Sequence, residues 1–334
     1  TRSGYASGQK YGAMLWSGDI TATWETMKKQ ITEGLNMGLS GYPYWTLDIG
    51  GFFTVRENWQ GRGCGCHNDP SPKWFWRGGF EEGVKDMGYR ELYVRWLEMG
   101  PFLPMFRSHG TDTPREIWNF GEKGTPFYDA IEKFIKLRYL LMPYIYSLAG
   151  AVRLENATMM RSLFFDFGAD KKTYEIKDEF LFGKNILVCP VTEPMYYLAG
   201  SQKIEESKKS RNCYLPEGAD WIDFWTGEYF TGGQDIERQA PLDQIPLFVK
   251  AGTILPLKEG MQYAGDREEE AVILHIFPGQ DGVFTLYEDE GDNYLYEREN
   301  IRPFPSHGKI KKIYLLLAAE RGTAKAVPGR GYFF

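Results

Sequence analysis

Residues 11–19 read YGAMLWSGD, a short apolar run that ends in a glycine turn and a carboxylate. Two later runs repeat this design. Residues 41–46 are followed by Asp48, and residues 102–106 are followed by the polar segment 107–109. Apolar runs of this length, bounded by Gly or Pro, are typical of buried strands. The three runs therefore predict three strands, each with a polar group just beyond its end.

Helical patterns lie between and after these runs. Residues 23–37 place apolar side chains on one face, with Thr23 as the expected N-cap, and residues 89–99 form a second pattern. Residues 127–148 predict a third helix, which Pro143 would kink. Alternating strands and helices indicate a parallel α/β sheet. In a (β/α)8 barrel, the catalytic groups lie at the carboxyl ends of such strands.

A long segment between the second and third expected strands, residues 53–88, is rich in glycine and aromatic residues. Long loops in compact domains are often functional. We therefore interpret this insert as a wall or lid over the site.

The sequence changes character after about residue 150. Short apolar or alternating runs are separated by turn residues, which is typical of antiparallel β-sandwiches. A boundary between two such modules is expected within residues 256–265. We predict a barrel part at 1–180, a proximal β domain at 181–258 and an incomplete distal β domain at 259–334. The expected strands are 180–182, 186–191, 221–224, 247–249, 271–276 and 283–287.

Composition limits the function classes. The 334 residues suffice for two or three domains, and 43% of them are hydrophobic. Aromatic residues make up 16%, which suits either a large core or stacking against sugar rings. The net charge is −6 and no long basic run occurs, so nucleic acid is not an expected partner. The apolar stretches are also too short to span a membrane.

Four cysteines are too few for a disulfide scaffold, and they do not fix the redox compartment. Periplasmic, extracellular and cytoplasmic locations all stay open, as does the oligomeric state. Residues 64–67 (CGCH) resemble half a zinc site, but their spacing is C-x-C and no second cluster follows. The acidic segment 288–293 does not match a calcium loop. We expect no metal and no cofactor.

Two aspartates are candidates for chemistry. Asp19 could be held protonated by partial burial beside the Trp16 ring, as a general acid requires. Asp48 precedes a Gly-Gly pair that lets the backbone approach a ligand, and its carboxylate would suit sugar hydroxyls. Each aspartate could instead cap a helix or a turn. A lone His109 is usually a packing or hydrogen-bonding residue, and it lacks partners at metal-ligand spacing.

The order of these motifs is more specific than any one of them. The chain closely resembles the second half of the barrel in glycoside hydrolase family 31, followed by its C-terminal β modules. The resemblance implies barrel strands 6–8 followed by two antiparallel β-sandwich-like domains. The matching segments are WSGD at 16–19, YWTLDIGGF at 44–52, FRSHG at 106–110, TPREIW at 113–118, MPYIY at 142–146, MRSLFFD at 160–166, PLFVKAG at 246–252 and YEDEG at 287–291.

The resemblance implies a retaining, exo-acting α-glycosidase that hydrolyses terminal α-linked sugars through a glycosyl-enzyme intermediate. Its substrate would be an oligosaccharide or glycoside. Asp19 matches the family's catalytic acid/base. The residues that match its sugar-binding positions are Arg2, Trp16, Asp48, Phe52 and His109.

One family feature is missing from this sequence. The family's nucleophile is an Asp in a Trp-x-Asp-x-Asn/Asp-Glu motif on the fourth strand, and this motif does not occur in residues 1–334. We therefore expect a fragment that is inactive alone, because both carboxyl groups are needed. The alternative is a non-catalytic carbohydrate-binding or scaffold protein. Among substrates, α-glucosides, α-xylosides, α-galactosides and α-N-acetylgalactosaminides all remain open.

Overall fold

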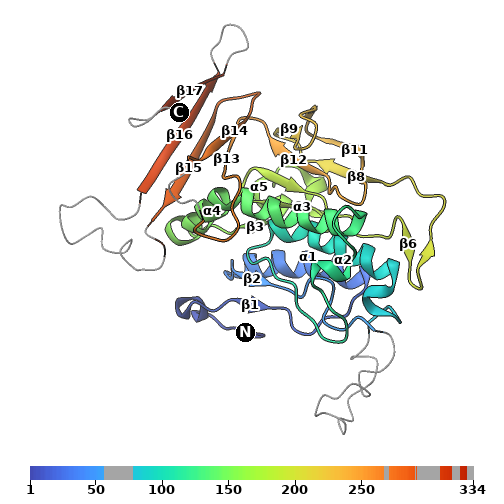
Figure 1. Cartoon of the computed structure of the whole chain (residues 1–334). Helices are drawn as coiled ribbons and strands as arrows, with labels where there is room; N and C mark the ends of the chain where they lie inside the picture. The colour runs from blue at the N-terminus through green and yellow to red at the C-terminus, as the bar shows by residue number, and fades with distance from the viewer. Residues whose placement is uncertain (56–77, 267–270, 290, 292–308, 318–323, 329–334) are drawn as a thin grey trace.

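A computed structural model describes residues 1–55, 78–266, 271–289, 291, 309–317 and 324–328. Figure 1 shows two regions, each with its own kind of secondary structure. The blue-to-green region holds a short parallel strand pair and the long helices. The yellow-to-red region consists mainly of antiparallel strands.

The first region begins with a parallel strand pair. Strands β1 (Leu15–Trp16) and β2 (Trp45–Thr46) pair in parallel, and helix α1 (Trp24–Leu39) connects them. The Thr23 side chain accepts a hydrogen bond from the backbone N–H of Thr26, so the expected N-cap is confirmed. The apolar face of α1 is buried and includes Met27, Ile31 and Leu35.

The third expected strand, residues 102–106, does not form, and that prediction was wrong. The chain instead makes the 3-10 turn η5 (Gly100–Phe102) and then an irregular segment. Pro101 and Pro104 lack the backbone N–H that a strand ladder needs, which accounts for the difference. The segment still runs parallel to the one after β2, through a bridge between Ile49 and Ser108. Residues 107–109 therefore lie beside the segment that follows β2, as expected for the polar residues after the third apolar run.

The predicted single helix over residues 127–148 is also corrected. Two helices occur, α3 (Pro126–Leu140) and α4 (Met142–Glu155). Pro143 lies in the first turn of α4, where its missing N–H costs nothing, so it starts a helix and does not kink one. The other helix, α2 (Met87–Met99), agrees with the expected 89–99. Short 3-10 turns occur at η1 (Gly8–Tyr11), η4 (Gly83–Lys85) and η6 (Ile117–Asn119).

The second region is built on a six-stranded antiparallel sheet. A second pair, β8 (Ser210–Leu215) with β11 (Gln234–Gln239), contributes Cys213 and Leu215 to an apolar cluster shared with the larger sheet. Along the chain, the α5 helix (Leu163–Asp166) and the η7 turn (Lys171–Tyr174) lie between β3 (Met160–Arg161) and β4 (Phe180–Phe182). The six strands, in spatial order, are β10 (Tyr229–Thr231), β9 (Asp220–Asp223), β12 (Leu247–Lys250), β5 (Ile186–Val188), β4 (Phe180–Phe182) and β3 (Met160–Arg161).

Two features of the sheets bear on the expected domain boundaries. Strand β3 joins the six-stranded sheet although it precedes residue 181. Strand β13 (Thr253–Leu257) runs through Pro256 and pairs with β14 (Ile273–Phe277).

A further sheet contains β15 (Gly282–Glu288), β16 (Lys309–Leu317) and β17 (Ala324–Pro328). Strand β15 packs on α4, where the Tyr287 N–H donates to Ser147 Oγ at 3.1 Å.

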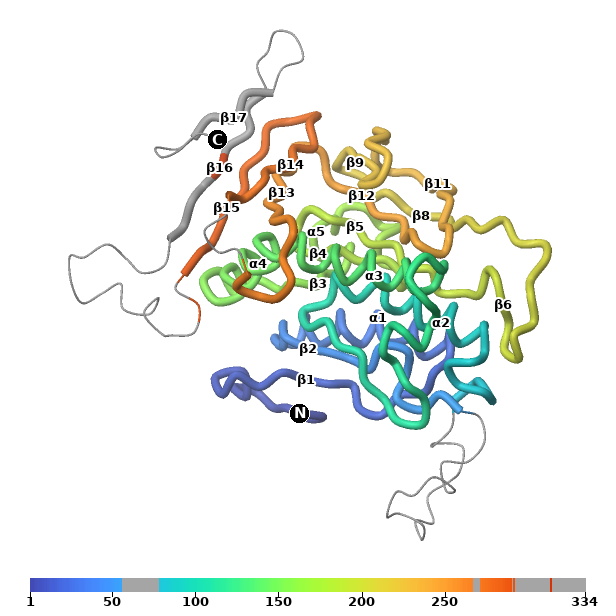
Figure 2. The backbone as a smooth tube through the Cα atoms, viewed as in Figure 1, coloured from blue at the N-terminus to red at the C-terminus, as the bar shows by residue number. Residues whose placement is uncertain are grey.

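Helix α2 ties the two regions together. Beside it lies a small hairpin of β6 (Tyr197–Leu198) and β7 (Gln202–Lys203), as Figure 2 traces. The fully buried Glu91 carboxylate accepts hydrogen bonds from the backbone N–H groups of residues 195–197, at 2.7, 2.9 and 2.7 Å. Asp86 accepts two more, from Gly200 and Ser201. Among the helices that the structure describes, none is both long and apolar enough to cross a lipid bilayer.

Candidate active site

Asp19 lies on the loop directly after β1. Gly18 before it has a φ of +86°, a left-handed conformation that favours glycine. The Asp19 side chain is 14% exposed, and its Oδ1 accepts a hydrogen bond from Arg2 Nη2 at 2.7 Å. Thr23 is the residue that caps α1, so Asp19 is not a helix cap. Its carboxylate is therefore available for another role.

Trp16 is the centre of the site. Its indole Nε1 donates to Asp48 Oδ1 at 2.8 Å. The guanidinium carbons of Arg2 and Arg107 lie over the ring, 4.8 and 5.3 Å from its centroid, within cation–π range. The His109 ring meets it edge-on, at 6.3 Å between centroids. Trp16 thus connects polar groups from three separate loops.

Asp48 is completely buried beneath this tryptophan. Its Oδ1 accepts hydrogen bonds from both Trp16 and Arg107, while its Oδ2 has no hydrogen-bond partner among the described residues. Burial raises the pKa of Asp48, and the bonds from Arg107 and Trp16 offset part of that increase. The carboxylate therefore holds Trp16 and Arg107 in place and keeps one free acceptor.

The turn after Asp48 requires its two glycines. Gly50 and Gly51 have φ values of +82° and +78°. A Cβ on Gly50 would lie 2.4 Å from a ring carbon of Tyr93, and one on Gly51 would lie 2.4 Å from the Ala22 nitrogen. No larger residue fits without backbone movement. The turn can therefore pass close beneath the site only because both positions are glycine.

Phe52 is placed by backbone bonds on both sides. Its N–H donates to Ile20 O at 2.7 Å, and its carbonyl accepts from the Thr111 N–H at 3.0 Å. The Phe52 and His109 rings are 5.4 Å apart. His109 is exposed and Phe52 is half-buried. The two rings form an aromatic edge next to Trp16.

All six predicted site residues are thus linked in one network, through Trp16 or through one of its neighbours. Two arginines that were not among the predicted site residues also support the site. Arg107 binds Asp48, and its alternation with His109 along an extended segment could have placed both on one side. Arg115 donates to the carbonyls of Gly51 and Phe52, which fixes the glycine turn. Nothing in its local sequence signals that role.

No metal-ligand cluster occurs at this site within the described part of the chain. One cluster elsewhere brings together Glu179, Cys189 and Cys213 in the β region. The half zinc motif at residues 64–67 lies outside the described residues, as does most of the insert at 53–88. The acidic segment at 288–293 is also only partly described.

Family comparisons agree with this architecture. The model for the glycosyl hydrolases family 31 TIM-barrel domain matches residues 1–148, and the model for the family's C-terminal domain matches residues 156–255. The chain belongs to glycoside hydrolase family 31.

Similar proteins of known identity include sugar hydrolases of two kinds. An alpha-xylosidase of Saccharolobus solfataricus is 36% identical over 322 residues, covering 96% of this chain and 38% of that protein. Alpha-glucosidase 2 of Bacillus thermoamyloliquefaciens is 32% identical over 302 residues, covering 89% of this chain and 32% of that protein. This chain therefore spans about a third of the length of these relatives.

Solved structures show the same relationship. The GH31 alpha-xylosidase of Xanthomonas citri has 39% identity and a TM-score of 0.76, covering 94% of this chain and 30% of that one. A GH31 dextranase of Flavobacterium johnsoniae, complexed with glucose, has 33% identity and the same TM-score of 0.76, covering 95% of this chain and 34% of that one.

Proposed function

We propose that this chain supplies the acid/base side of the active site of a retaining, exo-acting α-glycosidase. The observation that carries the proposal is the position of Asp19. It is a largely buried carboxylate after β1, held by Arg2 beside an aromatic ring that also meets Asp48 and His109. Family membership supports the same assignment. In this proposal, the first region is the C-terminal half of the barrel, with β1, β2 and residues 107–109 in the positions of strands 6–8.

Asp19 would act twice in each turnover. As an acid it would protonate the departing glycosidic oxygen, and as a base it would then deprotonate the water that releases the sugar. Arg2 bonds to the ionised carboxylate, the form that the second step requires. Because the Arg2 side chain is 61% exposed, it can move aside when a substrate arrives. The single contact thus holds Asp19 in position until a substrate binds.

The aromatic edge would bind the sugar at the site of cleavage. Trp16 and Phe52 offer apolar surface for one face of a pyranose ring, and the exposed His109 offers a hydrogen bond to a hydroxyl. Asp48 would contribute by holding Trp16 and Arg107, since its own carboxylate is buried. Such contacts favour catalysis when they strengthen in the transition state.

Retaining hydrolysis also needs a second carboxyl group, about 5–5.5 Å from the first, to attack the anomeric carbon. Asp19 is paired with Arg2, and residues 1–334 contain no Trp-x-Asp-x-Asn/Asp-Glu motif that would supply this second carboxyl group. We therefore place the nucleophile on polypeptide outside these 334 residues. The barrel part would end within residues 148–180, since the TIM-barrel match ends at residue 148 and the expected boundary lies at residue 180.

The test is hydrolysis by the protein expressed from its whole reading frame, with 4-nitrophenyl α-xyloside, α-glucoside and α-galactoside as substrates. We expect turnover of the xyloside or the glucoside. Proton NMR of the sugar at early times should show the α-anomer, since retention requires two displacements. Release of the β-anomer would overturn the retaining mechanism, and no turnover of any of the three would overturn the assignment.

A further inference from the structure

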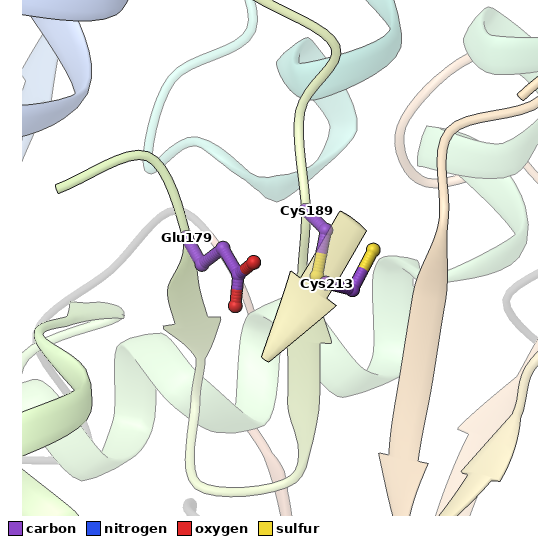
Figure 3. Close-up of side chains that lie close together, drawn as sticks. All are labelled: Glu179, Cys189 and Cys213. Atoms are coloured by element: carbon purple, nitrogen blue, oxygen red, sulfur yellow. The ribbon is translucent and has the colours of Figure 1, made fainter. Parts of the chain in front are cut away.

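A compact cluster of reactive side chains lies in the β region, away from the candidate active site. Cys189 directly follows β5, Cys213 lies in β8, and Glu179 directly precedes β4. All three are buried, and their sulfur and oxygen atoms lie within 4.8 Å of one another. Figure 3 shows the two cysteine side chains next to each other, with the glutamate to one side.

The two cysteines come from different sheets. Cys189 continues a strand of the six-stranded sheet, while Cys213 belongs to the β8–β11 pair. Around them lie apolar side chains that include Leu187, Leu215 and Phe248. The sulfur atoms therefore lie in the apolar interface where the two sheets pack against each other. Both cysteines are free thiols in this structure.

A metal ion is not what this cluster is built to hold. A structural zinc site has four ligands, and the described residues offer three. Both Glu179 oxygens already accept from the Tyr214 N–H, at 3.1 and 3.3 Å, and Arg211 Nη2 lies 3.3 Å from Oε1. The buried guanidinium already supplies the positive charge that balances the glutamate. A divalent cation here would face that guanidinium directly.

We propose that Cys189 and Cys213 form a disulfide that links the two sheets when a thiol oxidant is available. With glutathione disulfide as oxidant, the two thiols lose their hydrogens and one sulfur–sulfur bond forms between them. The oxidant's own sulfur–sulfur bond breaks and two glutathione thiols are released. The reaction removes two polar hydrogens from an apolar interface and adds no charge. It does not depend on the glycosidase assignment.

The two sulfur atoms lie within 4.8 Å of each other. A disulfide has a sulfur–sulfur distance of about 2.0 Å, so one or both side chains must turn about their Cα–Cβ bonds. Neither sulfur is at the surface, because both residues are 0% exposed. Burial also raises the pKa of the Cys189 thiol, which disfavours the reactive thiolate. Oxidation of the folded protein should therefore be slow, and oxidation during folding should be fast.

Peptide mapping tests the bond directly. The protein from the whole reading frame is refolded in buffers with different ratios of reduced to oxidised glutathione, alkylated and digested with trypsin. Cleavage after Lys184, Lys203, Arg211 and Arg238 gives peptides 185–203 and 212–238, each with a single cysteine. We expect these two peptides to be joined at oxidising ratios and separate after reduction. A C64S/C66S variant is the matched control and should keep the linkage.

Thermal unfolding gives a second measurement. The bond would close a loop from residue 189 to residue 213, so oxidation should raise the melting temperature of the β region by roughly 5 °C or more. A C213A variant should lose the oxidant-dependent increase while still folding. Two results would overturn the proposal. One is recovery of both peptides separate and alkylated at every glutathione ratio. The other is one equivalent of tightly bound zinc that is lost in C213A.

Discussion

Each region contains an aspartate–arginine pair that is partly shielded from solvent, but the two pairs are built differently. Asp19 accepts one hydrogen bond, from an Arg2 side chain that is 61% exposed. Asp166 accepts two bonds, at 2.6 and 2.7 Å, from an Arg161 side chain that is only 6% exposed. A bidentate bond to a buried guanidinium fixes a carboxylate in position. Asp19 instead has a single bond to an exposed arginine, an arrangement that suits the acid/base role proposed above.

The fully buried carboxylates show the same contrast. Asp48 and Glu179 are both paired with arginine, and burial raises the pKa of each. Both Glu179 oxygens are occupied by hydrogen-bond donors, but one Asp48 oxygen has none among the described residues. A buried acceptor without a partner is costly, so it is usually tolerated where function needs it. Among the described residues, the free oxygen of Asp48 is therefore a feature that the Glu179 carboxylate does not share.

The largest effect is expected from Asp19→Ala. For a substrate with a poor leaving group, kcat should fall by about 10²- to 10⁴-fold, the usual contribution of general acid–base catalysis. A 4-nitrophenyl glycoside needs little protonation of its leaving group, so its first step should suffer much less. Steady-state kinetics of the whole protein on both substrate types checks this.

Asp166→Ala is the matched control, because it breaks an aspartate–arginine pair in the other region. It should lower the melting temperature and leave kcat of the folded enzyme unchanged. If Asp166→Ala lowers kcat as much as Asp19→Ala does, the contrast between the two pairs is wrong.

The next largest effect is on stability. Arg211→Met would leave the buried Glu179 without its cation, which should reduce the free energy of unfolding of the β region by about 3–5 kcal/mol. Arg107→Met removes a guanidinium that is 33% exposed, so its stability cost should be smaller. It should also lower kcat/KM, because Asp48 and Trp16 lose their support. Urea unfolding measures the loss of stability in each variant, and steady-state kinetics measures the loss of kcat/KM. An Arg211→Met enzyme with impaired kcat/KM would contradict the prediction that Arg211 affects stability alone.

A smaller, pH-dependent effect should come from Glu179. Burial, against the opposing influence of Arg211, raises the pKa of Glu179 from 4.5 to about 7. The folded state then binds the proton more tightly than the unfolded state. The stabilising contribution is complete below pH 4.5 and is lost as the pH rises through about 7. The total loss should be on the order of 3 kcal/mol.

Urea midpoints from pH 4.5 to 8 measure this, with Glu179→Gln as the comparison. Glu98, whose pKa burial raises to about 8, changes stability in the same direction and is present in both proteins. Only the difference between the two curves is therefore assigned to Glu179. Parallel curves would show that Glu179 does not titrate in this range.

The smallest effect belongs to an exposed pair. Lys29 bonds to Glu25 one helical turn away on α1, and both side chains are largely in solvent. Lys29→Ala should leave the urea midpoint and the activity unchanged, because salt and water screen such pairs. A clear loss of stability would mean that burial does not decide how much an ion pair in this protein contributes to stability.

Local sequence patterns predicted the apolar elements well. Helices α1 and α2 and strands β4, β9, β12, β14 and β15 all overlap their expected ranges, because each has a clear apolar face or run. Strands β8 and β11 were missed. QDIERQ is mostly polar and SRNCYL is polar in its first half, so neither has a clear apolar run, and the two strands form by pairing with each other. That pairing depends on tertiary contacts that no short window contains.

The candidate site was predictable only in part, and for a similar reason. Asp19, Asp48 and His109 were identified because the order of the motifs resembles a known family. Their linkage through Trp16 depends on the relative positions of three loops. The support from Arg107 and Arg115 depends on long side chains that reach across those loops. Short motifs identify the individual residues, but the contacts between them depend on the tertiary structure.

The bonds that Glu91 makes have a consequence for protein engineering. The two family matches suggest a natural cutting point near residues 148–156, where one domain could be exchanged for that of a relative. Such a chimaera would fail unless the incoming domain also presented three backbone N–H groups to that buried carboxylate, as residues 195–197 do here. Recombination between family members should therefore succeed mainly where donor and recipient share this contact.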